Sequence, residues 1–279
     1  MDFVTNSFVF DEHRLVYDVY GEGDRVLLYM HGLLLDSEIN RGIAAALAER
    51  GTKVVLLDLL GHGRSDKPSH AAEYRIDSYA EQAVALLDEL GVETAAIGGM
   101  SLGANVSLFV ATEHPERVRA LVLEMPVLEW AVPAAALTFV PILLAAHYGR
   151  VLLTPLTAAV RRLPRTPFGP LNSILNAGST HPSVIAAVMH GVLVGPVAPT
   201  IDERIAIVSP TLVLAHGNDL IHPFEDANNL IHQVVRGTLV RATSPLELRL
   251  FPHRLTESIA RFLDESWSRP VAKPRLARA

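Results

Sequence analysis

The strongest constraint on the fold is an alternation of short, continuously apolar runs with longer amphipathic segments. Residues 53–58 (KVVLLD) predict a buried strand, residues 77–90 a helix, and residues 94–98 a further strand. A helix over 102–113 and a strand over 119–124 continue the series. Buried strands separated by helices are typical of a parallel sheet covered by helices on both faces. The sequence therefore predicts an α/β fold with a doubly wound, mostly parallel sheet.

Similar elements flank this series on both sides. Residues 8–20 alternate apolar and polar side chains and predict a hairpin that turns at Asp11-Glu12. Residues 25–30 form a short apolar run, and residues 37–50 have helical spacing with Ser37 as the expected N-cap. Late in the chain we expect a strand at 210–215, a helix from 224 to about 235, a strand at 246–251 and a helix from 255 to about 267.

Between the two series lies a stretch of different character. Residues 127–200 are rich in Ala, Leu, Val and Pro and contain no convincing strand pattern. We interpret them as a helical cap inserted into an α/β core made of residues 1–126 and 201–268. The basic residues 269–279 are expected to form a flexible tail.

One serine lies in a turn that is typical of a nucleophile. Gly99-Met-Ser-Leu-Gly103 fits G-x-S-x-G and falls between a predicted strand and a predicted helix. Glycines two residues either side of Ser101 permit the sharp turn that exposes the serine oxygen. The N–H of Leu102 then lies at a helix N-terminus, where backbone dipoles favour a developing negative charge. This context favours a nucleophile over a serine that is merely small enough for a turn.

The chain resembles the α/β-hydrolase family over residues 8–126 and 201–267. His31-Gly32 resembles the family's oxyanion loop, and residues 58–66 (DLLGHGRSD) resemble the turn after its fourth strand. The resemblance implies that the backbone N–H groups of Leu33 and Leu102 form the oxyanion hole. It also implies supporting roles for four residues in these turns: His31, Gly32, Gly99 and Gly103.

The same resemblance implies an acid and a base downstream of the serine. Asp219 follows a predicted strand in a His-Gly-Asn-Asp turn and is the favoured acid, with Glu124 as the alternative. His253 follows the predicted strand at 246–251 and is the expected base, although Pro252 replaces the glycine that usually precedes it. His222 is set aside because it lies too near the acid in sequence to occupy a separate loop.

A serine nucleophile implies chemistry at a carbonyl, since relatives that open epoxides or displace halide carry aspartate at this position. We expect a carboxylesterase-like serine hydrolase acting on an ester, thioester or lactone with a hydrophobic moiety. The alternatives are a C–C bond hydrolase of the meta-cleavage type, a perhydrolase, and a non-catalytic ligand-binding or receptor protein. The apolar cap is consistent with a hydrophobic pocket, a lipid-facing lid, a dimer contact or ordinary packing.

Composition and motifs indicate which cofactors and partners are not expected. The chain has no cysteine, and it lacks an HExxH zinc motif and a GxxxxGK[ST] phosphate loop, so no cofactor or metal is predicted. A formal net charge of -6 argues against nucleic acid as a partner. The N-terminus lacks the basic and apolar regions of a signal peptide, and the apolar stretch 131–146 is too short to span a bilayer. We therefore expect a cytoplasmic protein, with peripheral membrane contact and homo-oligomerisation left open.

Overall fold

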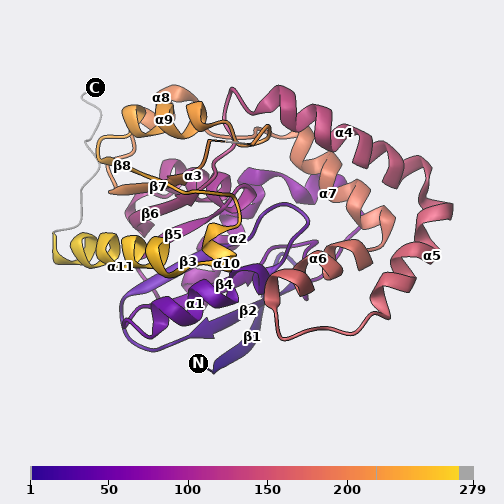
Figure 1. The fold of residues 1–279 in the computed structure, drawn as a ribbon, viewed down its shortest axis with the longest axis horizontal. Coiled ribbons are helices and arrows are strands. Elements are labelled where there is room, and N and C mark those ends of the chain that lie inside the picture. Colours follow the sequence, from indigo (N-terminus) through magenta and orange to yellow (C-terminus); the bar gives the residue numbers. More distant parts are fainter. Residues whose placement is uncertain (1, 218, 270–279) are drawn as a thin grey trace.

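The computed structural model describes residues 2–217 and 219–269, so most of the predicted tail lies outside the described residues. Its centre is an eight-stranded sheet in the order β1-β2-β4-β3-β5-β6-β7-β8 (Figure 1). The first two strands form an antiparallel hairpin, β2 pairs antiparallel with β4, and all later pairings are parallel. The predicted doubly wound, mostly parallel α/β fold is confirmed. The strands are β1 (Phe3–Phe10), β2 (His13–Tyr20), β3 (Val26–Met30), β4 (Lys53–Asp58), β5 (Ala95–Met100), β6 (Val118–Glu124), β7 (Thr211–Ala215) and β8 (Gly237–Arg241).

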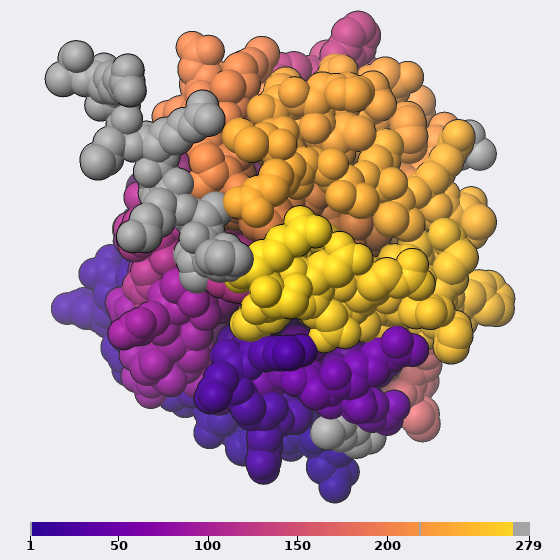
Figure 2. All heavy atoms as spheres, turned by 90° about the vertical axis from the view of Figure 1, so that its left-hand side faces the viewer, coloured from indigo at the N-terminus to yellow at the C-terminus, as the bar shows by residue number. Residues whose placement is uncertain are grey.

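Helices cover both faces of the sheet because the central strands are apolar on both sides. In β3, Val26, Leu28 and Met30 belong to one core cluster, whereas Leu27 and Tyr29 belong to the other. The first cluster packs against α2 (Ile76–Glu89), α3 (Leu102–Glu113) and α9 (Phe224–Gln233). The second packs against α1 (Arg41–Ala48) and α11 (His253–Ser268), and Figure 2 shows α11 in yellow beside α1 on that face.

The predicted insertion, residues 127–200, folds into four helices and has no strand. They are α4 (Val132–Tyr148), α5 (Arg150–Arg161), α6 (Gly169–Ser179) and α7 (Pro182–Val194), and together we call them the α4–α7 segment. They contact the short helices η1 (Ser37–Asn40) and η2 (Ala71–Tyr74), which follow the carboxyl ends of β3 and β4. The short helix α8 (Ile201–Ile205) then returns the chain to the sheet. The segment therefore lies over the edge of the sheet at which ligands bind in open α/β folds.

A buried amide and a buried carboxylate fasten the ends of the α4–α7 segment. Asn105 in α3 donates to the carbonyls of Val127 and Val197, at 2.7 and 2.6 Å, and accepts from the Val127 N–H. Asp226 in α9 accepts from the backbone N–H groups of three residues that precede or begin α4, namely Leu128, Trp130 and Ala131. Both ends of the segment are thus tied to helices of the core.

Two local predictions are wrong. Residues 246–251 form no strand, because Glu247–Leu250 is the short helix α10, and the last strand is β8. The N-terminal cap of η1 is Asp36, whose side chain accepts from the Glu38 N–H, rather than Ser37. The first error changes the site, because the loop after the last strand is now residues 242–246, where the sequence has no histidine.

Candidate active site

Ser101 lies at the turn between β5 and α3, in a backbone conformation that non-glycine residues rarely adopt. Its φ is 53° and its ψ is -108°. A Cβ on Gly103 would come within 2.6 Å of the Met30 carbonyl oxygen, and one on Gly99 would come within 2.7 Å of Gly103. The two glycines therefore allow α3 to begin directly against β3, and this close packing holds the serine in its strained turn.

The predicted oxyanion loop is fastened to this turn. The Gly103 N–H donates to the His31 carbonyl at 3.1 Å, and a Cβ on Gly32 would come within 2.8 Å of the Met100 side chain. Within the described residues, the backbone N–H groups of Leu33 and Leu102 donate no hydrogen bond to another protein group. Leu33, Ser101 and Leu102 line one pocket, so two unpaired N–H donors and the serine lie in the same small region.

His31 orders this loop. Its ring is fully buried; Nε2 accepts from the Leu59 N–H at 3.1 Å, and Nδ1–H donates to the Gly32 carbonyl at 2.9 Å. Burial lowers the pKa of the imidazole, despite the opposing charge of Asp58. A neutral ring with both nitrogens engaged has no proton to exchange with a substrate.

The loop between β7 and α9 supplies the partners of Ser101. His222 Nε2 accepts from the Ser101 hydroxyl at 3.0 Å, and its Nδ1–H donates to Asp219 Oδ2 at 2.7 Å. The other carboxylate oxygen, Oδ1, accepts from the Ile221 N–H at 2.8 Å. This hydrogen bond closes a tight turn in the loop, so an acid and a histidine three residues apart face each other.

The structure does not bring His253 to the serine, which corrects its assignment as the base. His253 is the first residue of α11, its side chain is exposed, and among the described residues it has no hydrogen bond to Ser101 or Asp219. The misassigned strand at 246–251 had placed it in the wrong kind of loop. Setting His222 aside for its closeness in sequence to Asp219 is wrong, because the turn at Asp219 permits the pair. The signal of His222 was present in HGNDLIHP, which contains both an acid and a histidine.

Glu124, the alternative acid, is engaged elsewhere. Its carboxylate pairs with the buried guanidinium of Arg249 and accepts from the Tyr29 hydroxyl at 2.9 Å. Its backbone carbonyl accepts from the Ser101 N–H at 2.8 Å. Glu124 thus supports the turn through its main chain, and its side chain serves a buried ion pair that joins β6 to α10.

The electrostatic surroundings favour an ionised Asp219. Burial is the largest single influence and acts to raise the pKa of its carboxyl, but the hydrogen bonds from His222 and Ile221, together with the charge interactions with His222 and His216, hold the pKa below its usual value. His216 Nε2 lies 3.6 Å from Asp219 Oδ2 and 3.1 Å from the Met125 sulfur. Burial lowers the pKa of His216, so its ring lies beside the acid in the neutral form near pH 7.

A narrow apolar pocket opens at Ser101 between the core and the α4–α7 segment. Its volume is about 60 Å³, and besides the turn residues it is lined by Asn105 and by aliphatic and aromatic side chains. The α4 helix contributes Ala135 and Phe139, and the end of α7 contributes Val192 and Leu193. A group held here would be largely out of water, with its polar end at the serine and the unpaired N–H groups.

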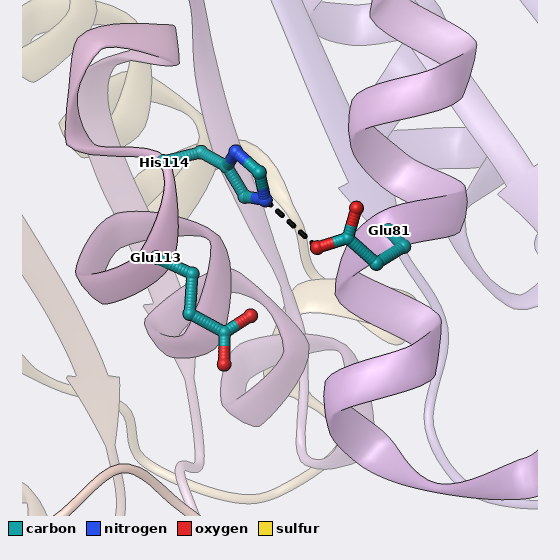
Figure 3. Close-up of side chains that lie close together, drawn as sticks. All are labelled: Glu81, Glu113 and His114. Carbon is teal, nitrogen blue, oxygen red and sulfur yellow. Dashed lines mark hydrogen bonds and ion pairs between the residues drawn. The ribbon is translucent and has the colours of Figure 1, made fainter.

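One trio elsewhere carries donors that could hold a metal. Glu81 in α2 and Glu113 and His114 at the end of α3 bring their ligand atoms within 4.8 Å of one another (Figure 3). His114 Nε2 is hydrogen-bonded to Glu81 at 2.8 Å, and the two glutamates are exposed. Ser101 lies at the opposite end of α3, about 18 Å away at 1.5 Å per residue. The trio is thus an exposed ion-pair cluster separate from the serine.

Comparison with known proteins identifies the family. A model of the α/β-hydrolase fold matches residues 25–167, just over half of the chain. An uncharacterised protein from Mycobacterium tuberculosis is 40% identical over 111 residues, covering 40% of this chain and 31% of the relative. A 2-hydroxymuconate semialdehyde hydrolase from Pseudomonas sp. (strain CF600) is 34% identical over 105 residues, covering 38% of this chain and 34% of the relative. Each match thus spans about a third of the relative's length.

A solved structure extends the likeness to the whole fold. The enol-lactonase from Burkholderia xenovorans LB400 superimposes with a TM-score of 0.74, covering 93% of this chain and 100% of that chain at 19% sequence identity. At 19% identity this likeness shows only a shared fold, whereas the matched family model shows membership of the family. The chain belongs to the α/β-hydrolase fold family.

Proposed function

We propose that the protein is a serine hydrolase that cleaves a carboxylic ester, thioester or lactone through an acyl-enzyme. The observation that carries the proposal is the continuous hydrogen-bonded series from the Ser101 hydroxyl through His222 to Asp219. A serine hydroxyl is a weak nucleophile until a base accepts its proton, and an orienting carboxylate stabilises the resulting imidazolium. The series supplies both partners, with His222 in place of His253.

The chemistry would proceed in two halves. Ser101 Oγ attacks the carbonyl carbon while His222 Nε2 takes the hydroxyl proton, and the carbonyl oxygen becomes an oxyanion beside the N–H groups of Leu33 and Leu102. The tetrahedral intermediate expels the alcohol or thiol, which receives the proton from His222. Water then attacks the acyl-enzyme with His222 as base, which releases the carboxylic acid and restores the serine.

The pocket supports a hydrophobic acyl group as the part of the substrate next to the serine. Its lining is almost entirely aliphatic or aromatic. The side chain of Asn105 is hydrogen-bonded to the backbones of Val127 and Val197 rather than directed at a substrate. We infer that the α4–α7 segment acts as a cap that excludes water from the acyl-enzyme. The small volume favours short acyl chains, and longer ones would require α4 to move.

Three variants test the arrangement. We expect Ser101→Ala and His222→Ala to lower kcat/KM for p-nitrophenyl butyrate by at least about 10³-fold, since each member of such a triad is needed for the chemical step. His253→Ala is the matched control and should stay within about twofold of wild type. Circular dichroism confirms that each variant is folded. Loss of activity in His253→Ala with retention in His222→Ala would overturn the proposed base.

A fluorophosphonate probe separates an activated serine from one that only lies in a binding site. Such a probe phosphonylates the serine with loss of fluoride, and it should label wild type but neither Ser101→Ala nor His222→Ala. An unlabelled wild-type protein would favour the ligand-binding alternative.

A series of p-nitrophenyl esters from acetate to decanoate tests the acyl pocket. Wild type should show the highest kcat/KM between propionate and hexanoate. A kcat/KM that falls steadily from acetate would contradict the inference that the apolar pocket binds the acyl group.

A C–C bond hydrolase is the second candidate, and one comparison favours it. The Pseudomonas relative is a 2-hydroxymuconate semialdehyde hydrolase, and its resemblance covers 38% of this chain. The same serine, histidine and oxyanion donors would serve cleavage beside a ketone. Assaying a vinylogous diketone beside the butyrate ester distinguishes the two, because a C–C hydrolase should turn over the diketone with the higher kcat/KM.

A further inference from the structure

The outer surface of α4 and α5 exposes apolar side chains in an unusual concentration. These helices form the outermost part of the α4–α7 segment in Figure 1, with α6 and α7 nearer the core. Six large apolar residues on them are 48 to 80% exposed and follow one another around the bend between the helices: Leu137, Leu144, Tyr148, Val151, Leu152 and Leu156. We call these six residues the α4–α5 ridge. Single exposed apolar residues are ordinary, but a continuous series of them marks an interaction surface.

The ridge is distinct from the face of α4 that lines the pocket. Ala135 and Phe139 face the pocket, one turn apart. At 100° per residue, Leu137, Leu144 and Tyr148 lie roughly 180 to 220° around the helix from Ala135. The apolar character of this outer face is therefore unexplained by the pocket or by packing onto the core.

The charged side chains of the α4–α7 segment are all cationic. Between Trp130 and Ile201 the chain has four arginines, namely Arg150, Arg161, Arg162 and Arg165, and neither aspartate nor glutamate. All four are exposed, and within the described residues none lies within 4 Å of a carboxylate. The whole chain has a net charge of -6, so this cationic segment belongs to an otherwise acidic protein. Arg161 donates to the Ser179 carbonyl and Arg165 to Asn176 of α6, whereas the side chains of Arg150 and Arg162 make no hydrogen bond within the described residues. The charges of Arg150 and Arg162 therefore favour an anionic partner.

We propose that the α4–α5 ridge docks onto an anionic phospholipid surface, with its leucines among the upper acyl chains and with Arg150 and Arg162, at the two ends of α5, at the phosphates. Helices that lie in the membrane interface combine these two features. The two helices cannot cross a bilayer as one rod, since they bend by 100° at their junction and no single described helix is long and apolar enough to span one. A second copy of the chain is disfavoured, because a two-fold contact would bring arginines together with no acid to neutralise them.

Docking by this ridge goes beyond the proposed hydrolysis and does not depend on it. The ridge shares no residue with the series Ser101–His222–Asp219 or with the oxyanion donors. Ser101→Ala should therefore bind vesicles as wild type does. A protein that binds vesicles but hydrolyses no ester would support the docking surface and contradict the proposed activity. A protein that hydrolyses esters but binds no vesicles would support the activity and contradict the docking surface.

Vesicle flotation tests the proposal with the full-length protein. Wild type should bind vesicles of phosphatidylcholine mixed with phosphatidylglycerol, and bind phosphatidylcholine alone at least about tenfold more weakly. Leu152→Glu/Leu156→Glu should reduce binding to the mixed vesicles by at least about tenfold, because two carboxylates would enter the apolar layer. Arg150→Gln/Arg162→Gln should reduce it by a similar factor and weaken its dependence on salt.

The control is Val9→Glu, which adds a carboxylate at a 71% exposed apolar residue of β1, outside the ridge. It should bind the mixed vesicles within about twofold of wild type. Failure of wild type to bind the mixed vesicles, or equal binding by the Leu152→Glu/Leu156→Glu variant, would overturn the proposal. So would a dimer in light scattering that this double variant abolishes, since the ridge would then be occupied by a second copy.

Discussion

Ser101 keeps its strained backbone because hydrogen bonds fix the turn on three sides. A non-glycine residue at positive φ costs about 1–3 kcal/mol and persists only where the surroundings determine it. Here the Ser101 N–H donates to the Glu124 carbonyl, the Asn105 N–H donates to the Ser101 carbonyl, and the Gly103 N–H donates to the His31 carbonyl. The serine, the first turn of α3 and the oxyanion loop therefore form one rigid unit.

Gly103→Ala tests this unit. The new Cβ would meet the Met30 carbonyl oxygen at 2.6 Å and the carbonyl carbon at 2.8 Å, and backbone atoms in a central strand cannot easily move. We expect a loss of about 1–3 kcal/mol in the free energy of unfolding and a fall in kcat/KM of at least about tenfold. Urea unfolding and esterase kinetics measure the two effects.

The matched control is Gly42→Ala in α1. A Cβ at Gly42 meets no atom within 4 Å, and this glycine has an ordinary helical conformation. Alanine there should stabilise the protein by about 0.5–1 kcal/mol and leave kinetics unchanged. If both variants behaved alike, the close packing of Gly103 would not be what holds the turn.

At the scale of elements, the proposed acid and base share one loop, whereas the proposed nucleophile belongs to another. Asp219 and His222 lie between β7 and α9, and their hydrogen bond is local to that loop. A displacement of the loop would keep this pair together while breaking the 3.0 Å contact with Ser101. The position of this loop relative to β5 thus determines whether the hydrogen bond between His222 and Ser101 forms, and with it the activation that we propose for the serine.

Much of this arrangement could be predicted from the sequence, and the errors have a physical cause. The strands from β3 to β7 are apolar runs bounded by glycine or polar turns, so the sequence predicts their type and their order along the chain, with Ser101 directly after β5. The sequence pattern does not predict β8, whose residues 237–241 are only partly buried. Residues 246–251 (LELRLF) suggest a strand because apolar and charged residues alternate in the first five positions, as in a half-buried strand. The structure instead exposes Leu246, Leu250 and Phe251. There Glu247 and Arg249 bury their charged groups in hydrogen bonds and ion pairs that no local pattern reveals. This error led to His253 as the expected base, and only the folded loop shows that His222, present in the HGNDLIHP segment, lies between Asp219 and Ser101.

Asn105 gives an element-scale prediction because it ties α3 to both ends of the α4–α7 segment. Asn105→Ala would leave three backbone groups without this partner, namely the buried N–H and carbonyl of Val127 and the partly buried carbonyl of Val197, which should cost about 2–4 kcal/mol of stability. The loosened segment should raise KM for the butyrate ester by a larger factor than it lowers kcat.

Ser107→Ala is the control in the same helix. Its hydroxyl is also buried but donates only to the Gly103 carbonyl within α3, at 2.7 Å. Its loss should cost less than about 1.5 kcal/mol and leave KM unchanged. Comparable changes in KM for the two variants would show that the fastening of the α4–α7 segment does not govern substrate binding.

At the scale of the whole molecule, stability should depend on two buried histidines, namely His31 in the predicted oxyanion loop and His62 beside it. The rings of His31 and His62 lie 4.8 Å apart, and both are almost inaccessible to water. Burial, aided by the charge of the neighbouring His31, lowers the pKa of His62 to about 3, and burial also lowers the pKa of His31. In the unfolded chain both would titrate near 6.5. The folded state therefore binds fewer protons than the unfolded state below this pH.

The sign of the effect follows from this difference in bound protons. Stability is fully present above about pH 6.5 and is lost as the pH falls, continuing for His62 until about pH 3. Each neutral histidine contributes a slope of up to about 1.4 kcal/mol per pH unit once its unfolded form is protonated. His62→Gln should consequently reduce the slope by about 1 kcal/mol per unit between about pH 4.5 and 6. Urea unfolding over this range measures it, with the exposed His232→Gln as control. An unchanged slope in His62→Gln would mean that the folded protein accepts a proton at this ring.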